Sequence, residues 1–366
     1  MVLEVGPSRR LENLAVAREA VEINAAGRVV LPGFVDSHTH LAFPPAGLPD
    51  DQDPDRAARA VRSFTAQRLE FRARAYLEAM ARHGTTTVEV KTGCGPDESA
   101  ESKILRVLWS LRYNPVDLIP SFLFMLPPSL NGDAATAADW VVAELLPKIR
   151  RRGIAKFADL AWDSNPSLAP YFDRYLLSAR EMGFRCKIHA DQKEPGYAID
   201  LALRHQVVSI DHLEHASPAG AEALAGAGII AILLPCAGFK KGCAAPARAL
   251  IDSGVAVALG TNFNPHHTPT LNMQAAVTMA CWRLGMSIEE AISAATYNSA
   301  HALGCAEQAG SIEPGKSADL VVLNTGDYRE LGANLGTNLV HLTMKRGKVI
   351  YKEGEVAPRP VEALVQ

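Results

Sequence analysis

The feature that most constrains the fold of this 366-residue chain is a regular alternation of short apolar runs with longer helical stretches. Eight apolar runs predict strands: 29–37, Thr86–Lys91, Val116–Met125, Ile154–Ala161, Arg185–His189, Val207–Asp211, Ile229–Leu234 and Val255–Thr261. Ala- and Leu-rich segments with helical spacing lie between them: 56–83, 98–113, 137–151, 167–182, 195–205, 217–227 and 244–253. Strand followed by helix, repeated in this way, predicts an α/β fold with parallel pairing, the (β/α)8 TIM barrel.

A second, smaller unit is predicted from the two ends of the chain. A helical Ala-rich stretch, 272–303, follows the last barrel strand, and a turn-strand pattern at 310–324 and a strand pair around 339–351 come after it. We expect residues 1–30 plus 308–366 to form a small β-sandwich domain and residues 31–307 to form the barrel domain.

Composition excludes several classes of partner. The net charge of −3 and the lack of a basic block argue against nucleic acid and anionic membranes. No apolar segment approaches the roughly 18 residues that a membrane span needs, and the first residues lack the pattern of a signal peptide. The six cysteines are scattered without a Cys-x-x-Cys pair, which is typical of reduced thiols in a cytoplasmic protein.

Histidines gather where the predicted strands end. His38 and His40 end the first strand two residues apart, so both side chains can point to one face. His189 ends the fifth strand, His212 follows the sixth and Asn262 follows the eighth. In a barrel of this type the carboxyl ends of the strands form the active site. Three imidazoles there can hold zinc or iron, and such a metal lowers the pKa of a bound water to about 7.

Several motifs support a family assignment. They are 32–41 (PGFVDSHTHL), 84–93 (GTTTVEVKTG), 187–191 (KIHAD), 209–214 (SIDHLE), Asn264-Pro265, 294–300 (AATYNSA) and 315–322 (GKSADLVV). In this order they resemble the amidohydrolase superfamily, and most closely the imidazolonepropionases of histidine degradation. The resemblance implies a metal-dependent hydrolase that acts on a C–N bond of a small cyclic amide, with one zinc or iron ion per chain. It also suggests a homodimer.

By this resemblance, His38, His40 and His189 are metal ligands and His212 contacts the substrate or the developing oxyanion. Asp211 and Glu214 are candidates to orient these histidines, because ligand imidazoles usually donate their second N–H to such a group. Lys91 and Cys94 are candidates for substrate contact, although an ion pair between Lys91 and Glu89 is the favoured interpretation of that lysine.

The sequence also departs from the family. The superfamily has a metal-binding aspartate after strand eight, where this chain has Asn262, and imidazolonepropionases have a glutamate where this chain has Gln192. An amide cannot act as a general base near pH 7, and a positioned base contributes about 10²–10⁴-fold. Both residues stay candidates for the catalytic site, with Asn262 also a candidate ligand.

Three features of substrate binding are missing as well. Cys94 stands where a tyrosine is expected, 44–47 (PPAG) where an arginine is expected, and no histidine occurs in 121–126 (SFLFML). An imidazolone-propionate needs a partner for its carboxylate, and arginine is the usual bidentate one. His266 and His267, adjacent in the loop after Asn262, are candidates for a replacement base or for substrate contact, with two exposed loop imidazoles as the alternative.

Alternatives to the hydrolase stay open. One is a catalytically impaired barrel that binds a small ligand, and another is an active enzyme altered at position 262. A third is a deaminase of the same superfamily, which would release ammonia where a ring-opening hydrolase would not.

Overall fold

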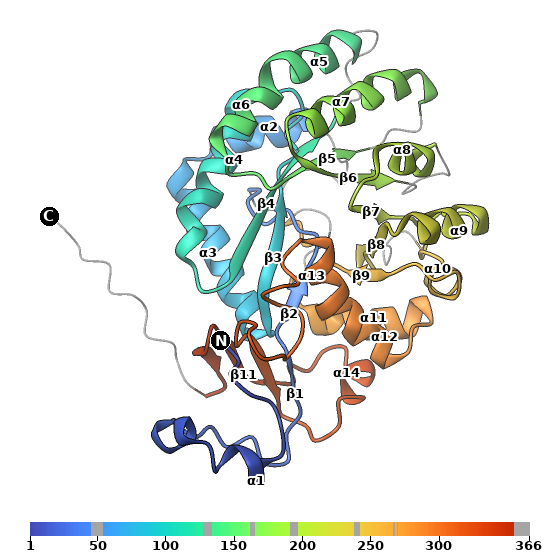
Figure 1. Cartoon of the computed structure of the whole chain (residues 1–366). Helices are drawn as coiled ribbons and strands as arrows, with labels where there is room; N and C mark the ends of the chain where they lie inside the picture. Colours follow the sequence, from blue (N-terminus) through green and yellow to red (C-terminus); the bar gives the residue numbers. More distant parts are fainter. Residues whose placement is uncertain are drawn as a thin grey trace, which may run out of the picture.

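The computed structural model describes residues 1–44, 54–126, 134–161, 165–190, 197–237, 242–265, 268 and 270–354. Its centre is an eight-stranded parallel sheet in chain order, β2 to β9 (Figure 1). The strands are β2 (Phe34–Asp36), β3 (Thr85–Lys91), β4 (Asp117–Phe124), β5 (Phe157–Ala161), β6 (Arg185–Ala190), β7 (Ser209–His212), β8 (Ile230–Leu233) and β9 (Val257–Leu259). The predicted (β/α)8 barrel is confirmed.

The sheet closes through backbone hydrogen bonds between its first and last segments. Asn262 N donates to His38 O at 3.0 Å, and His40 N donates to Phe263 O at 2.7 Å. The residues after β2 therefore lie beside the residues after β9. This closure brings the His-x-His segment and Asn262 together.

Helices follow the barrel strands as the sequence predicted. They are α2 (Pro54–Ser63), α3 (Ala66–Arg82), α4 (Glu98–Ser110), α5 (Ala134–Trp140), α6 (Leu146–Arg152), α7 (Ala169–Glu181), α8 (Ala198–His205), α9 (Pro218–Ala227) and α10 (Ala247–Asp252). The last barrel strand is followed by α11 (Met273–Leu284), α12 (Ile288–Ser293) and α13 (Ser299–Ala302). Two further short helices are α1 (Ser8–Leu11) and α14 (Glu330–Ala333).

Side-chain caps fix where several of these helices begin. The side chains of Thr65, Asp97 and Ser217 accept backbone N–H groups in the first turns of α3, α4 and α9. Thr65 also explains why the predicted helix 56–83 is two helices, since its extended backbone ends α2 and begins α3.

A second sheet lies at the amino-terminal side of the barrel strands (Figure 1). It contains β1 (Val30–Pro32), β10 (Leu320–Leu323), β11 (Val340–Lys345) and β12 (Lys348–Lys352), all antiparallel and in that order. It draws strands from both ends of the chain, as expected. It is the one sheet outside the barrel that the described residues form, so the second layer of the predicted β-sandwich stays a prediction. The Thr343 hydroxyl donates to Ala81 O at 2.7 Å, which joins β11 to the end of α3. The predicted division at residues 30/31 and 307/308 stays a prediction.

The predicted strand 29–37 is in fact two strands in two sheets. β1 pairs with β10, and β2 pairs with β3. Gly33 lies between them, and a Cβ at this position would collide with the side chain of Thr86. A glycine is needed here because the chain crosses from one sheet to the other against β3.

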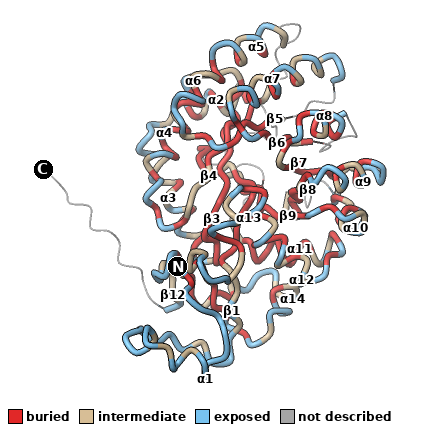
Figure 2. Tube along the Cα trace, viewed as in Figure 1, coloured by how far each residue is buried: buried red, intermediate tan, exposed pale blue. Residues whose placement is uncertain are grey.

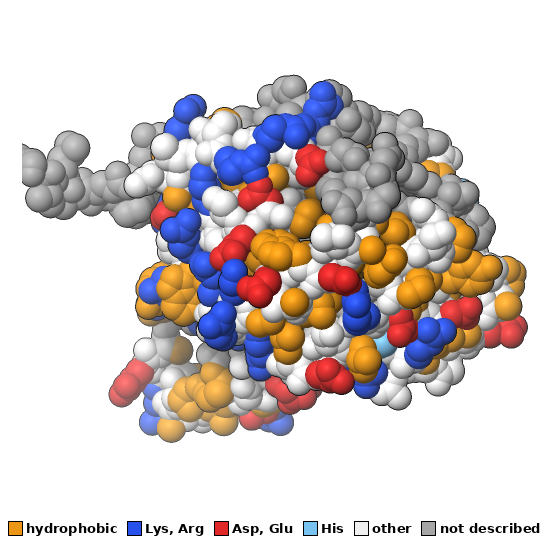
Figure 3. Space-filling view, turned by 90° about the horizontal axis from the view of Figure 1, so that it is seen from above, with side chains coloured by type: hydrophobic (Ala, Val, Ile, Leu, Met, Phe, Trp, Pro, Cys, Tyr) orange, Lys and Arg blue, Asp and Glu red, His pale blue; other side chains and the backbone are white. Residues whose placement is uncertain are grey.

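Burial follows this architecture. Figure 2 shows the buried residues concentrated along the strands and the exposed ones on the outer faces of the helices. The face seen from above in Figure 3 carries acidic and basic side chains interspersed with apolar ones. None of the described helices has the length and apolar character to cross a membrane.

Candidate metal centre

Three of the predicted histidines meet at the carboxyl ends of the barrel strands. His38 and His40 follow β2, and His189 lies in β6. The Nε2 atom of His38 is 3.3 Å from Nε2 of His40 and 3.2 Å from Nε2 of His189. The ring of His38 therefore lies between the other two, whose centroids are 6.3 Å apart.

Carboxylates hold the opposite nitrogens of two of these rings. His38 Nδ1 is 2.8 Å from Asp211 Oδ2, and His189 Nδ1 is 3.2 Å from Asp159 Oδ1. An ionised carboxylate only accepts hydrogen bonds, so we assign the ring proton to Nδ1 in both histidines. The Nε2 atoms of the neutral rings then carry bare lone pairs that face each other.

Two of the histidines, His38 and His40, are held in the neutral form that metal binding requires. Burial lowers the pKa of His38 well below its usual value, and the nearby charge of Lys91 lowers it further. Burial likewise lowers the pKa of His40, with added contributions from His189 and Lys91. Neutral imidazoles are ligands, whereas imidazolium ions are not.

The donor set fits a divalent metal ion. Two neutral nitrogens with facing lone pairs repel each other at 3.2 Å unless a cation lies beside both. Separations of this size suit nitrogens that share one zinc ion, because a Zn–N bond is about 2.0–2.1 Å long. The ligand atoms of His38, His189 and His212 all lie within 4.8 Å of one another, so His212 also faces this point.

A buried lysine contacts the two carboxylates that hold the histidines. Lys91 Nζ is 2.5 Å from Asp159 Oδ2, 2.9 Å from Asp211 Oδ2 and 3.2 Å from Glu89 Oε2. Asp159, His189 and Asp211 also form a group with the spacing of metal ligands, but its carboxylates already bind this ammonium. Burial alone would lower the pKa of Lys91, but the three carboxylates outweigh it and raise the pKa well above its usual value.

A second buried lysine completes this cluster of charges. Lys187 Nζ is 2.5 Å from Glu89 Oε2, and the Ser121 hydroxyl donates to Glu89 Oε1 at 2.5 Å. The side chains of Lys91, Lys187 and Glu89 have no exposed surface. The predicted ion pair of Lys91 with Glu89 is therefore present, as one part of a larger network.

His212 ends β7 in a strained backbone conformation. Its φ is +82° and that of the following Leu213 is +62°, a region that residues other than glycine rarely adopt. His212 Nδ1 is 3.2 Å from Glu214 Oε1, the orienting contact expected from the sequence. Glu214 Oε2 is buried, with no hydrogen-bond partner among the described residues.

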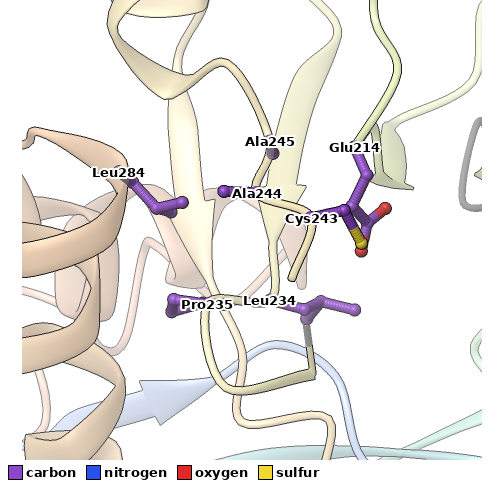
Figure 4. Close-up of a pocket in the computed structure, with 7 residues that line it drawn as sticks. All are labelled: Glu214, Leu234, Pro235, Cys243, Ala244, Ala245 and Leu284. Carbon is purple, nitrogen blue, oxygen red and sulfur yellow. The ribbon is translucent and has the colours of Figure 1, made fainter. Parts of the chain in front are cut away.

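Glu214 also lines a small pocket beside the metal centre (Figure 4). The other lining residues are mostly apolar: Leu234, Pro235, Cys243, Ala244, Ala245 and Leu284. In Figure 4 the carboxylate of Glu214 points toward Cys243. One residue, Glu214, therefore both lines the pocket and contacts the imidazole of His212.

Asn262 adopts the left-handed conformation, with φ of +53°, directly after Thr261. Asparagine tolerates this region better than most residues. Thr261 donates its backbone N–H, at 2.9 Å, and its hydroxyl, at 2.6 Å, to the buried Asp36. Burial raises the pKa of Asp36 to about 7, although these hydrogen bonds oppose the shift.

Other predicted site residues are placed differently or lie outside the described residues. Cys94 and Lys91 are fully buried, and Glu101 Oε1 accepts the backbone N–H of Cys94 at 2.5 Å. As substrate contacts, both residues stay predictions. Gln192, His266 and His267 lie outside the described residues.

Sequence reasoning missed three acidic residues that shape this centre: Asp36, Asp159 and Glu101. Each is fully buried. The available signal was an acidic residue inside an otherwise apolar strand for Asp36 and Asp159, since a buried carboxylate needs a partner. For Glu101, on a helix, no comparable signal existed.

Comparison with known proteins identifies the family. Residues 45–351 match the model of the amidohydrolase family. Imidazolonepropionase from Porphyromonas gingivalis is 38% identical over 90% of this chain and 83% of its own length. Imidazolonepropionase from Geobacillus kaustophilus is 35% identical over 97% of this chain and 89% of its own length.

Solved structures share the fold at lower identity. A mutant of atrazine chlorohydrolase from Arthrobacter aurescens, complexed with zinc and atraton, has a TM-score of 0.75 at 19% identity, over 96% of this chain and 89% of that one. The 5-methylcytosine deaminase from Klebsiella pneumoniae has a TM-score of 0.73 at 18% identity, over 93% and 92%. With the motifs, the barrel and these relatives in agreement, the chain belongs to the amidohydrolase family and is similar to its imidazolonepropionases.

Proposed function

We propose that this protein is a metal-dependent hydrolase that opens a C–N bond in a small cyclic amide, as an imidazolonepropionase does. The observation that carries the proposal is the arrangement of His38 and His189. Their Nδ1 atoms face carboxylates, and their Nε2 atoms face each other at 3.2 Å. Two lone pairs that face each other in this way favour a bound cation between them.

His38, His40 and His189 would hold the metal, and Asn262, in the segment after β9, would face it as a neutral fourth group. A divalent ion bound here would act as a Lewis acid and would lower the pKa of a bound water from 15.7 to about 7. The nitrogen donors suit zinc and iron alike. Replacing an aspartate by Asn262 removes one negative charge from the usual set of ligands.

His212 would carry the proton transfer that Asn262 and Gln192 cannot perform. Glu214 accepts from its Nδ1, so the Nε2 lone pair of the neutral ring faces the centre. The Nε2 lone pair of an imidazole can accept a proton, whereas a side-chain amide is not a base. The pair of His212 and Glu214 would thus accept the proton during attack and return it to the leaving nitrogen.

The remaining aspects of function are proposed on the same basis. We expect a small-molecule substrate that contacts Cys94, His266 and His267 or the loops around them. A cytoplasmic location and a homodimer are what the cysteine pattern and the resemblance suggest.

A second candidate function is ligand binding without turnover. Asn262 favours it, because this residue stands where the superfamily has a proton-accepting aspartate. The geometry of His212 and Glu214 favours the enzyme instead.

Assays on the wild-type chain and on Asn262→Asp would separate these functions. The substrates would be a panel of lactams, imidazolones and aminopyrimidines, with ring opening and ammonia release followed separately. We expect slow ring opening by the wild type that a metal chelator abolishes, and a gain of about 10²-fold or more in Asn262→Asp, since a positioned base contributes about 10²–10⁴-fold.

Asn262→Ser is the matched control, because it changes the same position without adding a base. Ammonia release with no ring opening would favour a deaminase. No turnover by either the wild type or Asn262→Asp would favour the ligand-binding alternative.

A further inference from the structure

We propose that Lys91 is a positioning residue for the metal centre: its ammonium fixes the two carboxylates that orient His38 and His189. This inference rests on the proposed metal-binding function. It adds to that function a residue that does not contact the Nε2 atom of His38 or of His189. It also gives Lys91 a role different from the substrate contact suggested by sequence.

One ammonium group contacts both orienting carboxylates. Lys91 Nζ is 2.5 Å from Asp159, which faces His189, and 2.9 Å from Asp211, which faces His38. The same Oδ2 atom of Asp211 receives both Lys91 and His38. The ammonium, the carboxylates and the two imidazoles therefore form one continuous chain of contacts.

The geometry of this chain leaves the carboxylates little freedom. Lys91 Nζ donates a hydrogen bond to Asp159 and lies within ion-pair distance of Asp211 and Glu89. None of the four side chains has exposed surface. Without the ammonium, the carboxylates of Asp159 and Asp211 would lose a shared partner and could rotate or repel each other.

The backbone places the ammonium in register with the ligands. Lys91 N donates to Thr39 O at 2.8 Å, and the Thr39 hydroxyl donates to Glu89 O at 2.6 Å. Thr39 lies between His38 and His40. These backbone contacts hold position 91 of β3 beside the segment of the ligand histidines, and they do not depend on the side chain at that position.

Charge and positioning predict opposite effects of removing Lys91. A positive charge this close repels a bound cation, so removing the charge alone would tighten metal binding. Loss of positioning would weaken it, because partners that orient ligand histidines typically contribute 10–100-fold in affinity. The sign of the change thus separates the two explanations.

The test is zinc affinity of the metal-stripped full chain, measured by competition with a chromophoric chelator, for wild type, Lys91→Met and Lys187→Met. Lys187 is the matched control, because it is equally buried and its ion pair is with Glu89, so its charge acts on Asp211 only from beyond ion-pair distance and not on Asp159 by contact. We expect Lys91→Met to bind zinc about 10–100-fold more weakly. Lys187→Met should bind within a few-fold of wild type.

Further measurements keep the outcomes distinct. Lys91→Gln retains amide donors and should show a smaller loss, and in an Asp211→Asn background the effect of Lys91→Met should shrink. A variant that is unfolded without metal is measured through the zinc concentration that refolds it, relative to Lys187→Met treated identically.

Equal or tighter zinc binding by Lys91→Met, with wild type binding zinc normally, would overturn this inference and leave the proposed function intact. An equal loss in Lys91→Met and Lys187→Met would also overturn it, since burial of charge alone would then explain both. A wild-type chain that binds no zinc would remove the proposed function and this inference together.

Discussion

Buried acidic residues set the properties of individual side chains around the barrel mouth. Glu101 is fully buried in α4, and its Oε1 accepts the backbone N–H groups of Gly93 and Cys94, in the loop after β3. Burial raises its pKa from 4.5 to about 7, although these hydrogen bonds oppose the shift. Folding therefore favours the protonated form of this carboxyl group relative to the unfolded chain.

The pH dependence of stability should report this group. A carboxyl whose pKa is raised on folding contributes stability that is fully present below its unfolded pKa of 4.5 and is lost as pH rises through about 7. The shift corresponds to about 3 kcal/mol. In Glu101→Gln, the free energy of unfolding in urea should fall less steeply over this pH range. Glu98→Gln, on the same helix but partly exposed, is the control. Parallel pH profiles for wild type and Glu101→Gln would contradict this assignment.

At the scale of elements, closure of the barrel depends on the segment after β9. The Thr261 hydroxyl donates to Asp36 at 2.6 Å and accepts from Phe263 N at 3.1 Å. Gly260 lies so close to β2 that a Cβ on it would be 2.8 Å from His38 Cβ. These contacts place the ligand segment beside Asn262.

Removing one hydroxyl should loosen this closure. In Thr261→Val, the buried Asp36 carboxylate loses a donor and Phe263 N loses its acceptor, so we expect a loss of about 1–3 kcal/mol in the free energy of unfolding. Thr261→Ser retains the hydroxyl and should lose less. Urea denaturation of the metal-stripped protein measures both. Equal stability of the two variants would show that the hydroxyl does not hold the closure.

Most helices and strands could be predicted from sequence, because each has a characteristic spacing of apolar residues and characteristic residues at its ends. Each of the eight runs predicted as strands overlaps a barrel strand. The division of 29–37 between two sheets could not be predicted, because an apolar run does not reveal which sheet it joins. Only the close approach of Gly33 to Thr86 explains that division.

The candidate site was predictable in part, for the same kind of reason. The spacing of His38 and His40 on one strand indicates convergence, and the structure places them 3.3 Å apart through Nε2. The contacts of Asp159 with His189 and Lys91 join three different strands. Such contacts depend on strand register and barrel closure, which no local pattern encodes.

For the whole molecule, the histidines connect segments far apart in the chain. His38 follows the first barrel strand, His189 lies in the fifth and His212 ends the sixth. An ion bound to them would therefore join distant parts of the barrel and stabilise the folded state as a unit. Binding to the folded state alone adds about 4 kcal/mol at a thousand times the Kd.

The most direct test of the central claim is the metal content of the purified chain, measured by mass spectrometry after expression with zinc and iron supplied. We predict about one divalent ion per chain in the wild type. We also predict a large loss of metal in His189→Ala, with Lys187→Met as the matched buried control. A folded wild-type chain that carries no metal, and whose unfolding is unchanged by added zinc, would contradict the claim that these histidines form a metal centre.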